Sequence, residues 1–349
     1  MDSSCLIQLS NMYIFVQGNV RIILPVLVND MTFALKSLPA IKQAIQDLCG
    51  HFKLRDLGPT TELLGIKIDR NRSNRSLTIS QLHYCAEMLA RYGMADSQPV
   101  STPMTPGLCL SREQRPRTTG ERAFMHSVDY GGAIRSLQYL SSTTRPYIAD
   151  TVGQLASFTS DPGVAHWNAI KHLSRYTKGT MDYAITYFPD PSMTQLFTTY
   201  SDANHGGCKD TGRSTGAYIV KIGTGVVSWM SKHQSIVALS TTEAEYMAAC
   251  EAGQEIVLQE LGFPMTAPSV LYMDNQSAIQ VAKHPEHHGW KKQLDLSCFW
   301  LRDVVDQGAI SPTYVPTGDM TADLLTKALP CLKVEHFYQE MGLAAFRGS

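Results

Sequence analysis

The sequence lacks three features that would place it in a specialised class of proteins. Its eight cysteines include no Cys-x-x-Cys pair, which fits reduced thiols better than a zinc site or a disulfide framework. The longest apolar runs, such as residues 22–28 with a proline inside, fall well short of the ~20 residues that a membrane span needs. A formal net charge of -1 gives no overall attraction to a polyanion, so binding of nucleic acid would require local basic surface.

A secretory signal is also missing from the first residues. Met-Asp-Ser-Ser-Cys has neither the basic start nor the apolar stretch of such a signal. Together with reduced thiols, this predicts an intracellular protein, cytoplasmic or nuclear, that is not secreted. The composition, 44% hydrophobic and 17% charged, is typical of folded proteins, and 349 residues are enough for two or three domains.

The first third of the chain contains alternating strand and helix patterns. Runs rich in β-branched residues predict strands, and apolar residues at helical spacing predict helices. Strands are expected at residues 21–28, 63–68 and 76–79, the last two as a hairpin, and helices at residues 38–52 and from Ser80, as the N-cap, to Tyr92.

A stretch rich in Pro, Ser, Thr and Arg follows at residues 99–119 and has the composition of an exposed linker. A boundary between domains is expected there. Helical spacing then predicts a small helical segment with helices at residues 130–140, 148–158 and 164–176.

The last part of the chain begins with three strand-like runs separated by glycine-rich turns, which indicates three antiparallel strands. The predicted strands are residues 196–201, 216–221, 226–230, 270–273 and 310–315, and the predicted helices are residues 240–261, 276–283, 293–305 and 319–329. This order predicts a mixed five-stranded sheet flanked by helices, an α/β architecture.

Four acidic residues stand at positions where a sheet of this kind collects functional groups. Asp202 and Asp274 each stand at the end of a predicted strand, two residues after a tyrosine. Glu245 and Asp323 each lie near the start of a predicted helix. Carboxylates at strand ends are held rigidly and face a crevice. Four of them could bind two Mg²⁺ ions, which prefer oxygen ligands and act together on phosphodiesters.

Each of these acids also has an ordinary explanation when it is taken alone. A Ser-Thr-Thr-Glu run is often only a helix N-terminus, where an acid interacts with the helix dipole. Two other clusters have similar alternatives. His284, His287 and His288 could bind a metal or form a polar loop, and Lys291 and Lys292 could contact phosphates or lie on a solvated helix face.

Six sequence blocks carry a resemblance that favours the catalytic interpretation. They are residues 200–210, 213–216, 239–246, 274–279, 314–317 and 322–327. In sequence and order these blocks closely resemble the ribonuclease H of copia-type LTR retrotransposon polyproteins. The resemblance implies an Mg²⁺-dependent endonuclease, with two ions and Mn²⁺ as a substitute, that cuts the RNA strand of an RNA–DNA hybrid.

On this resemblance Asp202, Glu245, Asp274 and Asp323 are the catalytic metal ligands, and Glu243 is the neighbour most easily misassigned. Thr317 stands where many cellular relatives of the fold carry a histidine, as is usual in the copia type. The predicted substrate-binding residues are Arg213, Ser214, Asn275, Gln276 and Lys292. The strand-end amides of Asn275 and Gln276 could reach a 2′-hydroxyl or a base edge in the minor groove.

The resemblance extends upstream of the nuclease blocks. Residues 52–58, 64–66, 77–81, 92–96 and 99–104 resemble the palm end and thumb-like region of the same elements' reverse transcriptase, and residues 144–146 and 165–180 resemble the connecting region. The predicted domains are a truncated reverse transcriptase (1–104), a linker and helical connection (105–195), a ribonuclease H domain (196–330) and a C-terminal tail (331–349). Expected partners are an RNA–DNA hybrid and other products of the retroelement polyprotein, with no membrane.

The chain departs from the family at two places. The polymerase signature Tyr-Val-Asp-Asp reads Leu-Val-Asn-Asp, so Asn29 and Asp30 form a degenerate polymerase site in which an amide replaces a metal-binding carboxylate. The first palm motif would lie upstream of residue 1, so we expect no DNA synthesis. At residues 288–297 the family's His and Arg positions are changed, which predicts weaker phosphate contacts. An alternative is therefore a catalytically inactive or co-opted nucleic-acid-binding remnant.

Overall fold

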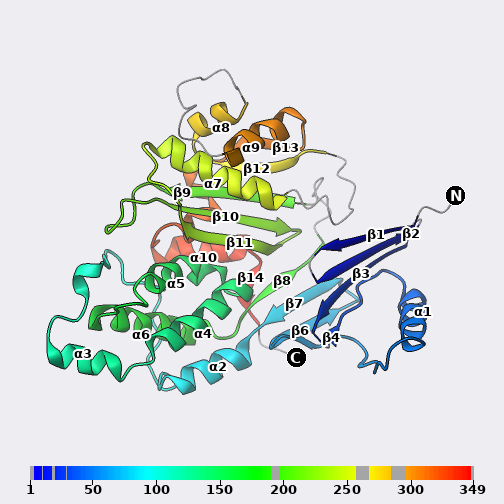
Figure 1. The fold of residues 1–349 in the computed structure, drawn as a ribbon, viewed down its shortest axis with the longest axis horizontal. Coiled ribbons are helices and arrows are strands. Elements are labelled where there is room, and N and C mark those ends of the chain that lie inside the picture. Colours follow the sequence, from blue (N-terminus) through cyan, green and yellow to red (C-terminus); the bar gives the residue numbers. More distant parts are fainter. Residues whose placement is uncertain are drawn as a thin grey trace. The chain divides into compact units, whose positions relative to one another are not determined.

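The structure, a computed structural model, describes residues 4–9, 11–17, 20–28, 30–189, 197–256, 267–283 and 296–346 (Figure 1). The described residues form two compact units that divide between Leu63 and Leu64, and each is presented by itself. Within the described ranges, none of the helices combines the length and the apolar character that crossing a membrane would require.

The first unit contains a four-stranded antiparallel sheet in the order β1-β2-β3-β4, followed by one helix. Its elements are β1 (Ser4–Leu9), β2 (Met12–Gln17), β3 (Val20–Leu27), β4 (Asp30–Met31), α1 (Leu38–Cys49) and β5 (Glu62–Leu63). The predicted strand at residues 21–28 and helix at 38–52 are confirmed. Ser37 begins the helix, because its side chain accepts a hydrogen bond from the backbone N–H of Ala40 at 3.5 Å. Strands β1 and β2 were not predicted from the sequence.

In the second unit, an antiparallel sheet joins segments from both ends of the chain. Its strands β6 (Ile66–Asn71), β7 (Ser76–Ser80), β8 (Tyr183–Tyr187) and β14 (Leu343–Ala345) lie in the order β14-β8-β7-β6. The predicted hairpin is confirmed. The predicted N-cap was wrong: Ser80 pairs with Lys67 at the end of β7, and α2 (Leu82–Arg91) begins only after Gln81.

The connecting region is helical, as predicted. Helices α4 (Tyr130–Thr143), α5 (Ala149–Ala156) and α6 (Val164–Gly179) bury their apolar faces in one common core. A further helix, α3 (Thr119–His126), begins at the end of the predicted linker. Thr118 caps it by accepting a hydrogen bond from the N–H of Glu121 at 3.2 Å, and the Glu121 carboxylate accepts one from the N–H of Thr118 in return.

The mixed five-stranded sheet predicted for the last part of the chain is present. Its strand order is β11-β10-β9-β12-β13, with β10 antiparallel to β9 and β11, and β12 parallel to β9 and β13. The strands are β9 (Phe197–Asn204), β10 (Thr215–Ile222), β11 (Gly225–His233), β12 (Ser269–Met273) and β13 (Ile310–Tyr314). The helices α7 (Thr241–Ile256), α8 (Gln276–Lys283) and α9 (Leu296–Asp306) accompany it.

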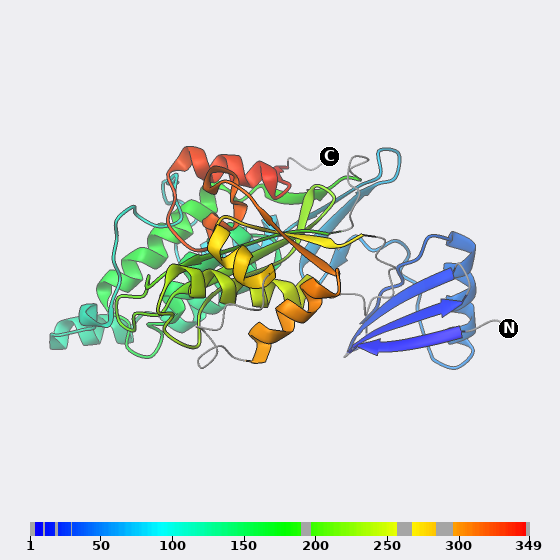
Figure 2. The same ribbon diagram turned by 90° about the horizontal axis from the view of Figure 1, so that it is seen from above.

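Both faces of this sheet are covered, as the views in Figures 1 and 2 show. Successive residues of a strand point to opposite faces, and β10 illustrates the result. Ala217 and Ile219 are buried in the core that contains α4, α5 and α6, whereas Tyr218 packs on the core built by α7, α8 and α9. The sheet therefore forms the middle layer between two groups of helices.

The C-terminal segment differs from the prediction. The single helix expected at residues 319–329 was wrong, because the chain forms two short 3-10 turns there, η5 (Thr317–Asp319) and η6 (Thr321–Leu325). Met320 separates the turns with an extended backbone conformation (φ -76°, ψ 91°) that a continuous helix cannot contain. The next helix, α10 (Cys331–Glu340), begins after Pro330 and was missed.

Candidate functional site

Two of the four acids predicted to be ligands are brought together by a pair of parallel strands. Tyr200 on β9 lies opposite Tyr272 on β12, and their rings stack with centroids 5.1 Å apart. Two residues further along the same direction, β9 carries Asp202, and Asp274 follows the last residue of β12. Parallel pairing in this register therefore places both carboxylates at neighbouring positions at the carboxyl end of the sheet.

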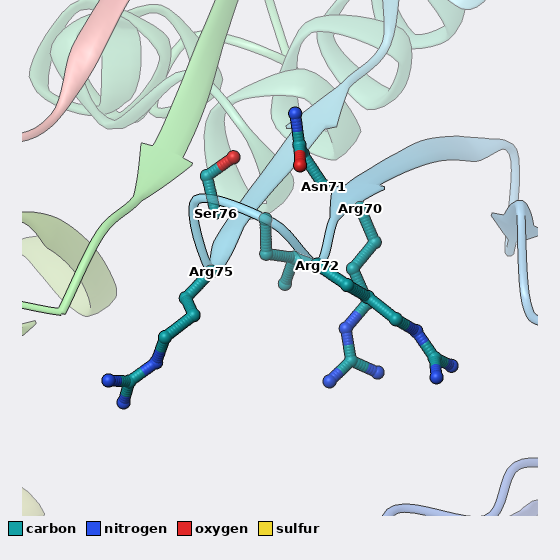
Figure 3. Close-up of a pocket in the computed structure, with 6 residues that line it drawn as sticks. Arg70, Asn71, Arg72, Arg75 and Ser76 are labelled. Carbon is teal, nitrogen blue, oxygen red and sulfur yellow. The ribbon is translucent and has the colours of Figure 1, made fainter.

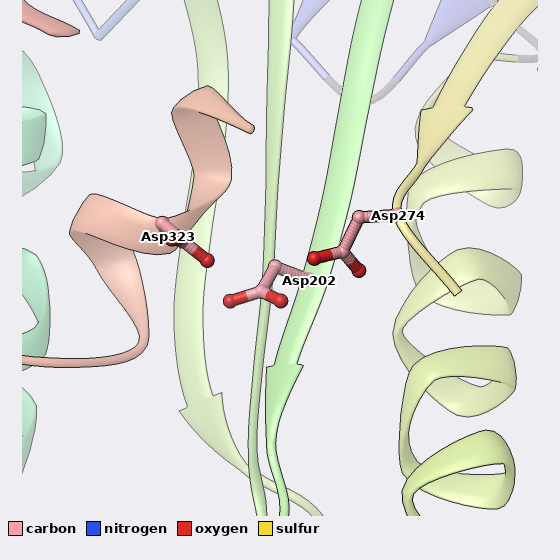
Figure 4. A group of neighbouring side chains, drawn as sticks. All are labelled: Asp202, Asp274 and Asp323. Atoms are coloured by element: carbon pink, nitrogen blue, oxygen red, sulfur yellow. The ribbon is translucent and has the colours of Figure 1, made fainter. Parts of the chain in front are cut away.

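A third acid reaches the same place from a different segment. Asp323 belongs to the short turn η6, which packs against β9 and β10, and its side chain is completely buried. One carboxylate oxygen from each of Asp202, Asp274 and Asp323 lies within 4.8 Å of the others. Figure 4 shows the three side chains converging from η6, β9 and the end of β12.

Glu245 approaches this group from helix α7. Its side chain is buried, hydrogen bonds with Asp202 and accepts a hydrogen bond from the backbone N–H of Ala203. Glu243, two residues earlier, has a different role: it accepts a hydrogen bond from the N–H of Leu239 at 2.7 Å, and its own N–H donates to Ser240 Oγ at 3.1 Å. Glu243 thus caps the helix, and Glu245 faces the aspartates.

Two threonine hydroxyls orient the aspartates. Thr326 donates a hydrogen bond to Oδ2 of Asp202. Thr317, directly after the loop that follows β13, donates one to Oδ2 of Asp274 at 2.8 Å. Each hydroxyl holds one oxygen of its carboxylate and so fixes the orientation of that group.

Two lysines neutralise part of the negative charge. Lys327 Nζ lies 2.6 Å from Oδ1 of Asp323 and 4.0 Å from Oδ2 of Asp202. Lys333, on α10, places its Nζ 3.1 Å from Oδ2 of Asp323. Asp323 is therefore paired on both oxygens, whereas no ion pair to Asp274 or Glu245 occurs in the described part of the chain.

Burial and mutual repulsion change the acidity of the cluster. Burial, and then the charges of Asp202 and Asp274, raise the pKa of Glu245 far above its ordinary value. Burial also raises the pKa of Asp202, although Lys327 opposes that shift. Partial burial lowers the pKa of Lys327, but the neighbouring Asp202 and Asp323 outweigh it and the net shift is upward. A bound divalent cation would reverse the repulsion among the acids.

The donor set fits a divalent metal. All the groups are carboxylate oxygens, the ligands that Mg²⁺ and Mn²⁺ prefer over nitrogen or sulfur. In addition, Oε2 of the buried Glu245 has no hydrogen-bond partner in the described part of the chain. Buried carboxylate oxygens are normally hydrogen bonded or coordinate a metal, so this oxygen supports the assignment.

The predicted substrate-binding residues occupy varied surroundings. Arg213 is exposed, whereas Ser214 is fully buried and its hydroxyl accepts a hydrogen bond from the N–H of Gly206 at 3.1 Å. Asn275 caps α8 by accepting a hydrogen bond from the N–H of Ala278 at 3.1 Å, and Gln276 is exposed beside it. Lys292 lies outside the described residues. The substrate-binding role of these side chains stays a prediction.

Other predicted sites are only partly covered by the structure. Asp30 is exposed at the start of β4, and Asn29, its partner in the degenerate polymerase motif, lies outside the described residues. The cluster of His284, His287 and His288 also lies outside them.

Three side chains that contact the acids were not predicted from the sequence: Thr326, Lys327 and Lys333. A local signal existed for Lys327, because a lysine four residues after an aspartate can pair with it across one helical turn. No local signal identifies Lys333, which is ten residues from Asp323 and reaches it only because α10 folds back beside η6.

Residues 6–106 match the family model described as "Reverse transcriptase (RNA-dependent DNA polymerase)". The first compact unit and the hairpin of β6 and β7 therefore come from a protein class that processes nucleic acids.

Two curated relatives extend the similarity over nearly the whole chain. A retrovirus-related Pol polyprotein from transposon TNT 1-94 of Nicotiana tabacum is 38% identical over 328 residues, covering 92% of this chain and 24% of the relative. The corresponding polyprotein from transposon RE2 of Arabidopsis thaliana is 32% identical over 342 residues, covering 96% of this chain and 22% of the relative. The chain belongs to the copia-type retrotransposon polyproteins. It spans about a quarter of the length of these relatives.

Among solved structures, the chain is similar to the N-terminal RNase H domain of a Mycobacterium tuberculosis protein, solved as a fusion protein with maltose-binding protein. The similarity covers 41% of this chain and 96% of that chain, with 15% sequence identity and a TM-score of 0.27.

Proposed function

We propose that the sheet of β9 to β13 carries a divalent-metal-dependent ribonuclease H activity that cuts the RNA strand of RNA–DNA hybrids. The observation that supports it is the convergence of Asp202, Asp274 and Asp323 from three separate segments, with ligand oxygens within 4.8 Å of one another. Isolated acids on a surface are common, but buried carboxylates are seldom placed together without a cation, because their repulsion costs stability.

The four acids, with Glu245 as the fourth, would hold the ions, which we propose to be two Mg²⁺ with Mn²⁺ able to replace them. Bound there, the ions would supply an activated water and stabilise the leaving oxygen of a phosphodiester. The protein's own part is positioning. Thr326 and Thr317 hold Asp202 and Asp274 by hydrogen bonds, and the rigid strand β9 fixes the centre of the group.

The substrate side of the proposal rests on groups around the strand ends. Arg213 is exposed and suited to a phosphate, and the amides of Asn275 and Gln276 follow Asp274 directly. Ser214 and Lys292 complete the proposed contacts. We assign residues 196–330 to the nuclease, 1–104 to the reverse-transcriptase part and 105–195 to the connection, with other polyprotein products as further partners.

We also propose that polymerase activity has been lost. The family's first aspartate of Tyr-Val-Asp-Asp is Asn29 here, and a neutral amide is a poor substitute for a carboxylate as a ligand of Mg²⁺. Incorporation of nucleotides on a primed template by the purified chain would contradict this part of the proposal.

The nuclease is tested by incubating an end-labelled RNA–DNA hybrid with the full chain and Mg²⁺. Cleavage of the RNA strand is expected from the wild type and from Asp319→Asn, which changes an exposed aspartate in η5, close in sequence to the cluster. Asp202→Asn should reduce cleavage by about a hundredfold or more, because a ligand is lost. Equal cleavage by Asp202→Asn and the wild type would end the claim.

A second candidate is a catalytically inactive protein that binds nucleic acid. It is favoured by one observation: Lys327 and Lys333 pair both oxygens of Asp323, so this acid already has cations beside it. Titration with Mg²⁺ distinguishes the two candidates. A rise in the unfolding temperature that depends on the four acids supports the nuclease, and no response to Mg²⁺ or Mn²⁺ supports the inactive protein.

A further inference from the structure

The hairpin of β6 and β7 carries a concentration of positive charge that the nuclease site does not use. Arg70, Arg72 and Arg75 fall within six residues, and all three are exposed. None of them forms an ion pair within the part of the chain that the structure describes. We call residues 70–75 the arginine hairpin.

The arginine hairpin is a structured turn. Its strands pair in register, with Arg70 opposite Leu77 and Asn71 opposite Ser76. Oδ1 of Asn71 accepts hydrogen bonds from the N–H of Ser73 at 3.0 Å and from its hydroxyl at 2.6 Å. Oδ1 of Asn74 accepts one from the N–H of Ser76 at 3.0 Å. These bonds fix the backbone from which the arginines extend.

The acid nearest in sequence points away from this charge. Side chains alternate between the two faces of a strand, so Asp69 lies on the opposite face of β6 from Arg70. On that opposite face Asp69 pairs in register with Thr78, whose buried hydroxyl hydrogen bonds with the hydroxyl of Thr186 on β8 at 3.0 Å. Asp69 therefore does not offset the charge on the arginine face.

Figure 3 shows the direction of the three side chains. Those of Arg70, Arg72 and Arg75 extend from the hairpin toward the same side, and with Asn71, Ser76 and Leu77 they line a shallow hollow. Three guanidinium groups on one side of a fixed turn can contact several phosphates of one backbone at the same time.

We propose that the arginine hairpin is a docking surface for the sugar–phosphate backbone of a nucleic-acid duplex. This deepens the proposed function, on which it rests, by naming the surface that holds the RNA–DNA hybrid. Arginine recognises phosphate with paired donors, and contacts of this kind position a duplex without reading its sequence. Because the chain has a net charge of only -1, its affinity for a polyanion must come from local surfaces such as this one.

The hairpin also belongs to the same compact unit as the acids. β7 pairs with β8, and the Tyr187 hydroxyl at the end of β8 donates to the carbonyl of Val226 on β11 at 2.8 Å. The hairpin is thus joined through β8 to the sheet that bears Asp202. A duplex held there would be held by the same compact unit that carries the cleavage site.

An anionic membrane would offer the same phosphate chemistry, but the hairpin does not suit one. The four residues of its turn are Arg72, Ser73, Asn74 and Arg75, so no apolar side chain stands at the tip to enter a lipid layer. Peripheral membrane sites usually combine basic residues with such apolar anchors. A nucleic-acid duplex requires only the charges and the donors.

The test is the salt dependence of binding, measured by fluorescence anisotropy of a labelled RNA–DNA hybrid in EDTA, so that no cleavage occurs. The full chain is compared with Arg70→Gln/Arg72→Gln/Arg75→Gln, whose exposed positions leave the fold intact. We expect the slope of log K against log salt to become shallower by about 2 to 3, and affinity at ~100 mM salt to fall about tenfold or more.

Two variants serve as matched controls. Arg70→Lys/Arg72→Lys/Arg75→Lys keeps the charge and should keep most of the slope. Arg112→Gln/Arg115→Gln/Arg122→Gln removes the same charge from another arginine cluster, where Glu113 and Glu121 are interleaved, and should change the slope far less. Equal loss in both glutamine variants, or an unchanged slope in the first, overturns the proposal.

The last measurement is the binding of the same proteins to vesicles that contain phosphatidylserine. Arginine-dependent binding to these vesicles with no arginine-dependent binding to the hybrid would assign the surface to lipid and overturn the proposal. Because binding is measured without metal, the arginine-dependent binding of the hybrid can be observed even if the nuclease is inactive. Conversely, a variant that has lost docking should still cleave the hybrid at the acids when the hybrid concentration is high. The failure of one proposal can therefore be distinguished from the failure of the other.

Discussion

Lys327 Nζ lies 2.6 Å from Oδ1 of Asp323 and 4.0 Å from Oδ2 of Asp202, so one ammonium group stands between two proposed metal ligands. A metal ion and this ammonium group compete for the same carboxylate charge. When no metal is bound, the lysine lowers the repulsion between the acids. It also reduces the negative charge with which they attract a metal ion.

Replacing Lys327 with methionine should therefore strengthen metal binding. The side chain is 40% exposed, so solvent weakens the effect, and we expect Mn²⁺ to bind about threefold to fivefold more tightly. Isothermal titration calorimetry of the full chain measures this directly. Lys209→Met is the control, because Lys209 pairs with the exposed Glu113 and not with the cluster. Unchanged or weaker Mn²⁺ binding by Lys327→Met would show that the lysine does not compete.

Thr326 should act as a positioning residue for Asp202. Its hydroxyl donates to Oδ2 of Asp202, and valine has nearly the same shape but no donor. Thr326→Val should lower the rate of hybrid cleavage about tenfold and weaken Mn²⁺ binding, because the carboxylate loses its orientation. Thr326→Ser keeps the hydroxyl and should restore both quantities. A valine variant that binds and cleaves like the wild type would rule out this role.

Asp150 should make the stability of the protein depend on pH. It is buried in the first turn of α5, where Oδ2 accepts a hydrogen bond from Gln154 at 2.9 Å and Oδ1 has no partner in the described part of the chain. Burial raises the pKa of Asp150 to about 6, because the charged form is poorly solvated there. The folded state thus binds the proton more tightly than the unfolded state does.

The sign of the effect follows from this difference. The stabilising contribution of the protonated group is complete below the unfolded pKa near 4 and is lost as the pH rises through about 6. Asp150→Asn should raise the free energy of unfolding at pH ~8 by up to about 3 kcal/mol and change it little at pH ~4. Urea unfolding at both pH values measures this, with the exposed Asp161→Asn as control. Equal effects at the two pH values would contradict the prediction.

Arg145 should be essential to the core of the connecting helices. Its side chain is fully buried, and the guanidinium donates to the carbonyls of Thr180 and Met181 at 2.7 and 2.9 Å. Lysine cannot satisfy both carbonyls from one planar group, so Arg145→Lys should reduce the free energy of unfolding by about 3 kcal/mol. The exposed Arg135→Lys should change it by less than about 0.5 kcal/mol. Thermal unfolding that is equal for both variants would refute this role.

Much of the fold was predictable because its elements have strong local patterns. The five strands of the mixed sheet and the helices α4 to α8 follow apolar periodicity and turn residues, which act over a few neighbours. The failures also have local causes. Met320 adopts an extended conformation in a stretch whose apolar spacing predicts a helix, and Ser80 is drawn into the ladder with Lys67 and so does not cap α2.

The candidate site was predictable in its acids and not in their surroundings. Strand patterns in the sequence specify which carboxylates stand at strand ends, and the capping pattern of Ser240 and Glu243 leaves Glu245 for the cluster. Long-range packing brings Lys333 to Asp323 and places the arginine hairpin in the same compact unit as the acids. The physical reason is range: propensity and capping act within a few residues, whereas contacts between distant segments exist only after both faces of the sheet have been packed.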